Sequence, residues 1–266
     1  MQLFIGLLLA VTGSYIAYHA KSLSKDGAFA AAFIGTIIFG LGGWQWSILL
    51  LTFFISSSLL TRAFKNRKQG LDEKYSKGGQ RDAGQVFSNG GIAALFVVLH
   101  ALNPQTIWVW PGFAAALAAV NADTWATELG VLNPNPPRLI TDLRKRVEKG
   151  TSGAISVYGT SAALLGAAII GLLAAVLFPT SNGSIFFLVT LSGLLGSLID
   201  SLLGATVQAI YFCPTDSKET EKHPLHTCGT PTIQIRGWKW LNNDWVNGIC
   251  SYSAVVFMSL FMHILS

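Results

Sequence analysis

Asn121-Ala-Asp-Thr-Trp-Ala-Thr-Glu-Leu-Gly130 is the polar end of a segment that is otherwise apolar from Trp108 onward. Two carboxylates, Asp123 and Glu128, therefore fall in a segment apolar enough to cross a membrane, where ionisable groups are costly and mark functional sites. At about 100° per residue, the polar side chains of this stretch share one arc of roughly 160°, opposite the apolar ones. We expect this polar face to point into a protein interior.

The composition is that of an integral membrane protein. Of the 266 residues, 51% are hydrophobic and only 12% are charged, which is about half the charged fraction of a soluble globular protein. The length suits one helical domain over residues 1–266. Three cysteines give no disulfide framework. The start, Met1-Gln-Leu-Phe4, lacks the basic region of a signal peptide, so we expect the first apolar run to be retained as a helix.

Eight apolar segments are long enough to cross a bilayer, which takes about 20 residues as a helix. Only Leu41-Gly-Gly-Trp44 separates the second from the third, so a re-entrant pair is the alternative there. We expect an all-α polytopic membrane protein, a bundle of about eight transmembrane helices. The segments cover residues 2–18, 27–43, 45–61, 85–102, 107–128, 155–178, 185–211 and 245–264.

Every Lys and Arg lies in alternate connections between these segments, and the remaining connections and both termini carry none. By the positive-inside rule the basic side is cytoplasmic or stromal, which puts both termini on the non-cytoplasmic side. The net charge of +5 is then explained by topology and lipid headgroups, which argues against a nucleic-acid partner. The cytoplasmic loops are predicted at residues 62–84, 129–154 and 213–244.

Carboxylates within the predicted helices indicate a bound cation. Asp123, Glu128 and Asp200 would repel one another unless a cation lay between them. Hard oxygen ligands suit Mg²⁺, which keeps several waters and bridges to substrate phosphates. Asp200 is expected about 17 Å before the cytoplasmic end of its segment. Asp244 starts the last segment, where it could instead cap the helix.

A glycine-rich stretch, Lys149-Gly-Thr-Ser-Gly153, precedes the sixth segment and fits an anion site. Its glycines let the backbone approach a phosphate, its hydroxyls donate hydrogen bonds, and the helix N-terminus adds a favourable dipole. The motifs together indicate a polyanionic ligand with a metal, presented to a membrane-embedded partner. Hydroxyl groups such as that of Ser88 could instead serve only helix packing.

The seventh connection carries Cys213, Asp216, His226 and Cys228. The pairs Cys213-x2-Asp216 and His226-x-Cys228 could supply four ligands of mixed type to a zinc ion. The alternative is an ordinary solvated hairpin.

The motifs resemble those of one membrane-protein family. It includes transmembrane protein 19 of animals and the phytyl-phosphate kinase of plants and cyanobacteria. The resemblance covers nearly the whole chain, and the combination of motifs is specific where no single motif is. The motifs are Ser24-Lys-Asp-Gly27, Asn121 to Gly130, Lys149-Gly-Thr-Ser-Gly-Ala154, Gly229-Thr-Pro-Thr232 and Asn242-Asn-Asp-x-Val-Asn247.

This resemblance implies a kinase that converts phytyl or a related prenyl monophosphate into the diphosphate, with Mg²⁺ and CTP as the phosphoryl donor, for tocopherol and phylloquinone synthesis. It implies a multi-pass protein of a plasma membrane or a thylakoid or chloroplast-type membrane. The isoprenoid tail would lie in a groove lined by small residues such as Gly35, Gly40, Gly90, Gly91 and Gly166.

The residues themselves agree with this chemistry and give a hypothesis for their roles. The catalytic residues would be Asp123, Glu128, Lys149 and Arg81. The Mg²⁺ ligands would be Asp123, Glu128, Asp200 and Asp244. Nucleotide binding would use Lys149, Gly150, Thr151, Ser152, Gly153, Asn121, Arg144, Arg146 and Asn243. The acceptor would contact Arg81, Ser88, Asn89, Lys25 and Asp26.

Three alternatives stay open on the sequence alone. A prenol kinase and a CDP-lipid cytidylyltransferase would use the same face. A lipid or solute transporter would place its charges near the bilayer midplane between inverted repeats, whereas here they gather toward one face. The sequence leaves the oligomeric state open.

Overall fold

A computed structural model describes residues 1–68, 73–178 and 184–265, and within them the chain is mainly helical. One turn of π-helix, η1 (Ile38–Gly42), continues α2, and a short 3₁₀ turn, η2 (Lys65–Lys68), follows α3. The long helices are α1 (Gln2–His19), α2 (Lys25–Ile37), α3 (Trp44–Ala63), α4 (Ala83–Leu102), α5 (Val109–Gly130), α6 (Val157–Leu177), α7 (Ser184–Thr206) and α8 (Asn243–Leu265).

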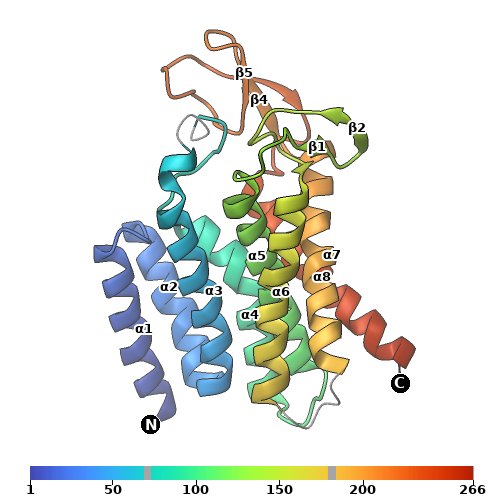
Figure 1. The fold of residues 1–266 in the computed structure, drawn as a ribbon. Coiled ribbons are helices and arrows are strands. Elements are labelled where there is room, and N and C mark those ends of the chain that lie inside the picture. The colour runs from blue at the N-terminus through green and yellow to red at the C-terminus, as the bar shows by residue number, and fades with distance from the viewer. Residues whose placement is uncertain (69–72, 179–183, 266) are drawn as a thin grey trace.

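Seven of the long helices in the described residues are long and apolar enough to span a membrane, α2 together with η1 among them. The eighth, α5, is less apolar, and it contacts α3, α4, α6, α7 and α8 around it (Figure 1). Every residue from Val109 to Ala122 of α5 is buried. A helix that other helices cover does not face lipid, so it can carry small and polar residues that a lipid-facing helix could not. The predicted all-α polytopic bundle is confirmed.

Gly43 separates the second and third spans. Its φ of 85° lies in the left-handed region that favours glycine. The chain reverses there, and α2 with η1 and α3 are each long enough to span. The re-entrant alternative is therefore not what the structure has.

The seventh span ends earlier than predicted. The helix α7 stops at Thr206, and the chain then enters β4 (Ile210–Cys213). This strand is largely buried and rich in aromatic and β-branched residues. In the sequence its apolar run follows that of α7 directly, so hydropathy alone does not separate the strand from the helix. Asp200 therefore lies six residues, or about 9 Å, before the helix end rather than about 17 Å.

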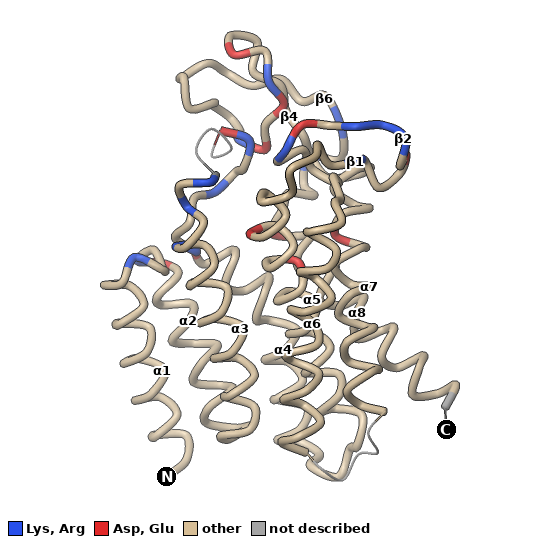
Figure 2. Tube along the Cα trace, in the orientation of Figure 1, with Lys and Arg blue, Asp and Glu red and all other residues tan. Residues whose placement is uncertain are grey.

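Two small antiparallel sheets cover one end of the bundle. In the first, the order is β2-β1-β3, from β1 (Arg138–Leu139), β2 (Asp142–Arg146) and β3 (Ala154–Ile155). In the second, the order is β5-β4-β6, with β5 (Lys218–Thr220) and β6 (Ile233–Arg236). Both termini lie toward the other end (Figure 1). The Lys and Arg segments gather at the end that carries the sheets (Figure 2). Which end is cytoplasmic stays a prediction.

The glycines predicted to line a lipid groove mostly serve helix packing instead. A Cβ on Gly40 would lie 2.9 Å from Leu3, and one on Gly35 would lie 3.0 Å from Ala10 of α1. A Cβ on Gly166 would lie 3.0 Å from Trp125 and 3.1 Å from the Asn121 carbonyl. Small residues allow membrane helices to approach closely, so the groove predicted along these three glycines is wrong.

Candidate active site

A cavity of about 730 Å³ opens at the end of the bundle that carries the sheets. Its wall comes from the ends of α3, α5 and α7, the starts of α4, α6 and α8, and the loops between them. Segments far apart in the sequence therefore meet at one site. The predicted site residues on its wall are Arg81, Asn89, Asp123, Glu128, Lys149, Gly150, Thr151, Ser152, Gly153, Asp200 and Asn243.

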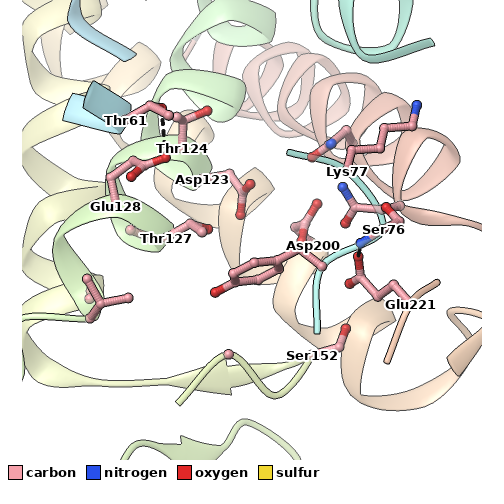
Figure 3. Close-up of a pocket in the computed structure, with 18 of the residues that line it drawn as sticks. Thr61, Ser76, Lys77, Asp123, Thr124, Thr127, Glu128, Ser152, Asp200 and Glu221 are labelled. Atoms are coloured by element: carbon pink, nitrogen blue, oxygen red, sulfur yellow. Dashed lines mark hydrogen bonds between the residues drawn. The ribbon is translucent and has the colours of Figure 1, made fainter. Parts of the chain in front are cut away.

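Three carboxylates share the deep part of this cavity. Asp123 of α5, Asp200 of α7 and Glu221, which follows β5, point toward the same space (Figure 3). They are close enough for mutual repulsion. One oxygen of Asp200, Oδ2, is buried without a hydrogen-bond partner. A buried carboxylate oxygen without a donor is costly, and either a bound cation or a proton would offset that cost.

The metal prediction needs one correction. Only one group of three or more His, Cys, Asp or Glu residues gathers within reach of a single ion in the described part of the chain. It lies at the end of β4 and in the loop that follows. Asp123, Glu128 and Asp200 share the cavity, but they do not gather closely enough for one ion to touch all three. Mg²⁺ takes few protein carboxylates and fills its octahedron with water and phosphate oxygens. Asp123, Asp200 and Glu221 are not gathered around one point either, so they could share one Mg²⁺ only with waters or phosphate oxygens between some of them and the ion.

Glu128 has a different environment from the deep carboxylates. Thr61 of α3 donates a 2.8 Å hydrogen bond to its Oε1 (Figure 3). Its charge also acts on Arg81, which is buried at the start of α4. Burial lowers the pKa of the Arg81 guanidinium, and the Glu128 carboxylate opposes that shift. Glu128 is thus a counter-charge for a buried arginine at the cavity wall.

Arg81 is held by the α1–α2 connection. Its backbone N–H donates to the Ser22 carbonyl, and its own carbonyl accepts from Ser24 N–H. Its Nη1 donates to Ser58 Oγ over 2.9 Å. A Cβ on Gly27 would lie 2.1 Å from the Arg81 carbonyl oxygen, so only glycine fits there.

Two residues predicted to contact the acceptor, Lys25 and Asp26, lie beside this connection at the start of α2. Asp26 accepts from Ser24 Oγ and from the Ala83 N–H, and Lys25 is exposed away from the cavity wall. Asp26 therefore ties the start of α2 to the start of α4. The motif Ser24 to Gly27 positions Arg81, and its Lys25 and Asp26 do not line the cavity where the acceptor was predicted to bind.

The Lys149–Gly153 stretch lines the cavity but is not a helix N-terminus. The strand β3 follows it, and α6 begins only at Val157, with Ser156 capping the Gly159 N–H. The predicted dipole therefore acts at Ser156, Gly159 and Thr160, which also lie on the cavity wall.

Within this stretch the glycines allow sharp turns. Gly150 and Gly153 have φ values of 78° and 79°, and a Cβ on Gly153 would lie 2.4 Å from Ala205 of α7. Ser152 Oγ donates to Gln208 Oε1, and Lys149 Nζ donates to the Val131 carbonyl. The stretch is thus pinned against α5 and α7 with its face toward the cavity.

Asn121 is structural in this fold. Its side chain is fully buried, accepts hydrogen bonds from Ser56 and Ser57, and donates to the Gly166 carbonyl. It joins α3, α5 and α6 below the cavity, so its predicted contact with a nucleotide is wrong.

Four further predicted residues lie off the cavity wall. Arg144 and Arg146 are exposed on β2. Ser88 donates to the Gln85 carbonyl within its own helix. Asp244 forms an ion pair with Lys77, which also pairs with Asp82, so it joins the starts of α4 and α8 and not the carboxylate group.

Sequence reasoning gave no site role to Glu221 or Lys77, which the fold brings to the cavity. Glu221 accepts from Ser76 N–H over 3.2 Å and from Gln208 Nε2 over 2.8 Å. Lys77 reaches the same wall from the loop before α4. These residues sit in polar loops among other charges, so no pattern in the sequence separates them from solvated neighbours.

A helical multi-pass membrane protein with an acidic cavity at its basic end is the class that this fold and site define. The chain belongs to the family described as integral membrane protein DUF92, which it matches over residues 8–255. The family resemblance that the motifs indicated is confirmed, as is a multi-pass membrane location.

Several relatives are known by name. Protein PGR of Arabidopsis thaliana is 34% identical over 92% of this chain and 91% of its own length. The uncharacterized membrane protein MJ0933 of Methanocaldococcus jannaschii is 35% identical over 77% of this chain and 83% of its own. Protein VTE6, chloroplastic, of Arabidopsis thaliana is 27% identical over 91% of this chain and 66% of its own. No solved structure matches the chain significantly.

Proposed function

We propose that this chain is a membrane-embedded kinase that transfers a phosphoryl group from CTP to phytyl or a related prenyl monophosphate. The observation that carries the proposal is the cavity in which buried carboxylates of α5 and α7 face basic loops. An acidic floor needs a cation, and a basic rim suits phosphates, so the site fits a metal–phosphate ligand.

The residues present fit Mg²⁺. Asp123, Asp200 and Glu221 would hold it, in part through its bound waters, and Asp200 Oδ2 is a buried carboxylate oxygen with no hydrogen-bond partner. When bound, the ion would neutralise charge on the transferring phosphoryl group and bridge the donor phosphates. We add Glu221 to the proposed Mg²⁺ ligands because it shares the cavity with the two aspartates. We remove Asp244 from them because it pairs with Lys77.

The remaining charges divide between two ends of the cavity. Lys149 and the Gly150–Gly153 backbone lie beside α6 and α7, where they would bind the donor phosphates. Arg81 and Asn89 lie on the α4 side, where they would orient the acceptor phosphate. The acceptor is already a phosphate and is nucleophilic without a strong base, so catalysis needs positioning and charge neutralisation.

The lipid tail needs an apolar path from this end of the bundle. A groove of about 350 Å³ runs along α3, lined by Ile48, Leu51, Thr52, Ile55, Ser56 and Leu59. The next turn of the same helix carries Thr61, which lines the cavity. We place the isoprenoid tail in this groove, in place of the glycine-lined one.

Kinship adds a second line of support. The family resemblance includes a phytyl-phosphate kinase, and the chain shares 27% identity with protein VTE6, chloroplastic. Protein PGR and MJ0933 are more similar in sequence, and their names state no activity. The reaction is therefore proposed from the cavity first and from kinship second.

The test is a product analysis with purified protein in detergent or proteoliposomes. Labelled CTP or ATP is supplied with Mg²⁺ and phytyl or geranylgeranyl monophosphate. We expect CDP and the lipid diphosphate from CTP, with both nucleotide consumption and product dependent on the added monophosphate. Pyrophosphate with a CDP-lipid would identify a cytidylyltransferase, and turnover of the free alcohol would identify a prenol kinase. Unchanged substrates under all conditions would overturn the kinase proposal.

A further inference from the structure

Four ligand atoms gather at the end of β4 and in the loop that follows it, which also lends residues such as Thr227 to the cavity wall. The sulfurs of Cys213 and Cys228, a carboxylate oxygen of Asp216 and a ring nitrogen of His226 all lie within 4.8 Å of one another. The two pairs come from separate turns, one after β4 and one before β6. We propose that these four residues form a structural zinc site.

The distances are close to those of a tetrahedral site. Zinc binds sulfur at about 2.3 Å and nitrogen or oxygen at about 2.0–2.1 Å, so sulfurs lie about 3.8 Å apart and sulfur and oxygen about 3.5 Å apart. Here the Cys213 and Cys228 sulfurs are 3.5 Å apart, and Cys213 Sγ lies 3.7 Å from Asp216 Oδ2. Two of the six edges of the tetrahedron are therefore already near their final length.

The histidine is oriented as a metal ligand. His226 is almost fully buried, and its Nε2 lies 3.2 Å from the Glu73 carbonyl. A carbonyl can only accept, so Nε2 donates there and Nδ1 is the nitrogen that faces the cluster. A hydrogen bond from the other ring nitrogen to a carbonyl is the usual outer contact of a zinc-bound histidine. Nδ1 lies 2.7 Å from Asp216 Oδ2 without hydrogen-bond geometry. Zinc between these two atoms would spread them by about 0.6 Å.

The backbone forms a knuckle around the second pair. Gly229 N–H donates to the His226 carbonyl, and His226 N–H donates to the Thr230 carbonyl. Gly229 has a φ of 81°, a conformation that favours glycine. This tight turn points the His226 and Cys228 side chains to one side. A solvated hairpin has no need to bring a buried histidine to two thiols.

A disulfide explains the cluster less well. The Cys213 and Cys228 sulfurs are 3.5 Å apart, against about 2.05 Å in a disulfide. The loop also lies at the basic end, which the positive-inside rule predicts to be cytoplasmic and reducing. A disulfide would use only two of the four gathered ligands.

The site would hold the loop to the cavity. The Glu73 carbonyl accepts from Thr220 Oγ1 as well as contacting His226, and Glu73 pairs with Lys218. One residue further, Glu221 N–H donates to the Lys74 carbonyl. The four ligands are all from the protein, so the site is closed and structural. Its role is to position Glu221, and it does not depend on the proposed kinase reaction.

The test is the metal content of full-length protein purified in detergent from zinc-supplemented cells without chelator. We expect about one zinc per chain by elemental mass spectrometry. Cys213→Ser and Cys228→Ser should each reduce it to near zero. Cys250→Ala is the matched control, because Cys250 is buried in α8 away from this loop, and it should keep the zinc. Asp216→Cys, which preserves four ligands, should keep it too.

Two experiments on wild-type protein test the proposal even if a variant fails to fold. Wild-type protein titrated with a thiol reagent should release zinc in proportion to modification of Cys213 and Cys228. Chelation should speed proteolysis within residues 213–232 severalfold without changing cleavage elsewhere. Wild-type protein that carries no zinc and takes up none on addition, or a Cys213–Cys228 disulfide found by mass spectrometry, would overturn the proposal.

Discussion

Gln208, just after α7, donates a 2.8 Å hydrogen bond to Glu221, which follows β5. Gln208 is buried and also accepts from Ser152 in the glycine-rich stretch. One side chain thus fixes both the extra carboxylate and the proposed donor-phosphate loop relative to α7. The site is assembled by contacts between loops as much as by the helices that carry Asp123 and Asp200.

Glu221→Gln should change the pH dependence of stability. Burial raises the pKa of Glu221 above its ordinary value of 4.5 in the metal-free protein. A carboxyl with a raised pKa adds stability below its unfolded pKa, and this is lost as pH rises through the folded pKa. From about pH 5 to about pH 8, the melting temperature of metal-free wild type should therefore fall more than that of Glu221→Gln. Parallel pH profiles for the two proteins would remove Glu221 from the carboxylate group.

Asp200→Asn should abolish the proposed reaction while stabilising the metal-free protein. The substitution removes the repulsion between a charged Asp200 and its neighbours Asp123 and Glu221. Loss of one essential charge-stabilising group costs about 100- to 1,000-fold in turnover. Asp142→Asn on exposed β2 is the matched control and should change neither quantity. Turnover assays measure the loss of the reaction, and thermal shifts with and without Mg²⁺ measure the change in stability. An Asp200→Asn protein that Mg²⁺ still stabilises as strongly as wild type would contradict the metal role.

The sequence predicts the helices far better than the site. Apolar length and the Lys and Arg pattern identify each span, because the bilayer constrains both. The end of α7 is the exception, since β4 is as apolar as a helix and only its fold reveals a strand. The order of helices around α5 has no signal in any single segment.

Within the site, buried carboxylates in helices are predictable because their cost marks them. Asp123 and Asp200 follow from that rule. Glu221 does not, because a glutamate in a polar loop looks like any solvated residue until the fold buries it. Asn121 shows the opposite error, since a polar residue beside a site can be a packing element.

Asn121→Ala should weaken the fold without changing nucleotide affinity. The substitution leaves the Gly166 carbonyl without its donor inside the bundle. An unsatisfied buried group costs about 1–3 kcal/mol. Equilibrium unfolding in mixed detergent measures the loss, and the KM for CTP should stay within about twofold. Asn89→Ala, on the cavity wall, should instead keep its stability and raise the KM for the prenyl monophosphate. A large rise in the KM of Asn121→Ala with unchanged stability would restore its predicted role at the nucleotide.

Gly6→Val should detach α1 from the bundle. A Cβ on Gly6 would lie 2.5 Å from the Gly40 backbone in η1, and backbone atoms cannot move aside as a side chain can. Forcing extra volume into a close helix contact costs about 1–3 kcal/mol or more. We expect faster proteolysis in the α1–α2 connection. We also expect loss of the backbone hydrogen bonds that hold Arg81, because that connection makes them. Gly13→Val is the matched control on the same helix, because a Cβ there meets nothing within 4 Å. Equal proteolysis of the two variants would show that the α1 contact does not depend on the close approach of Gly6 and Gly40.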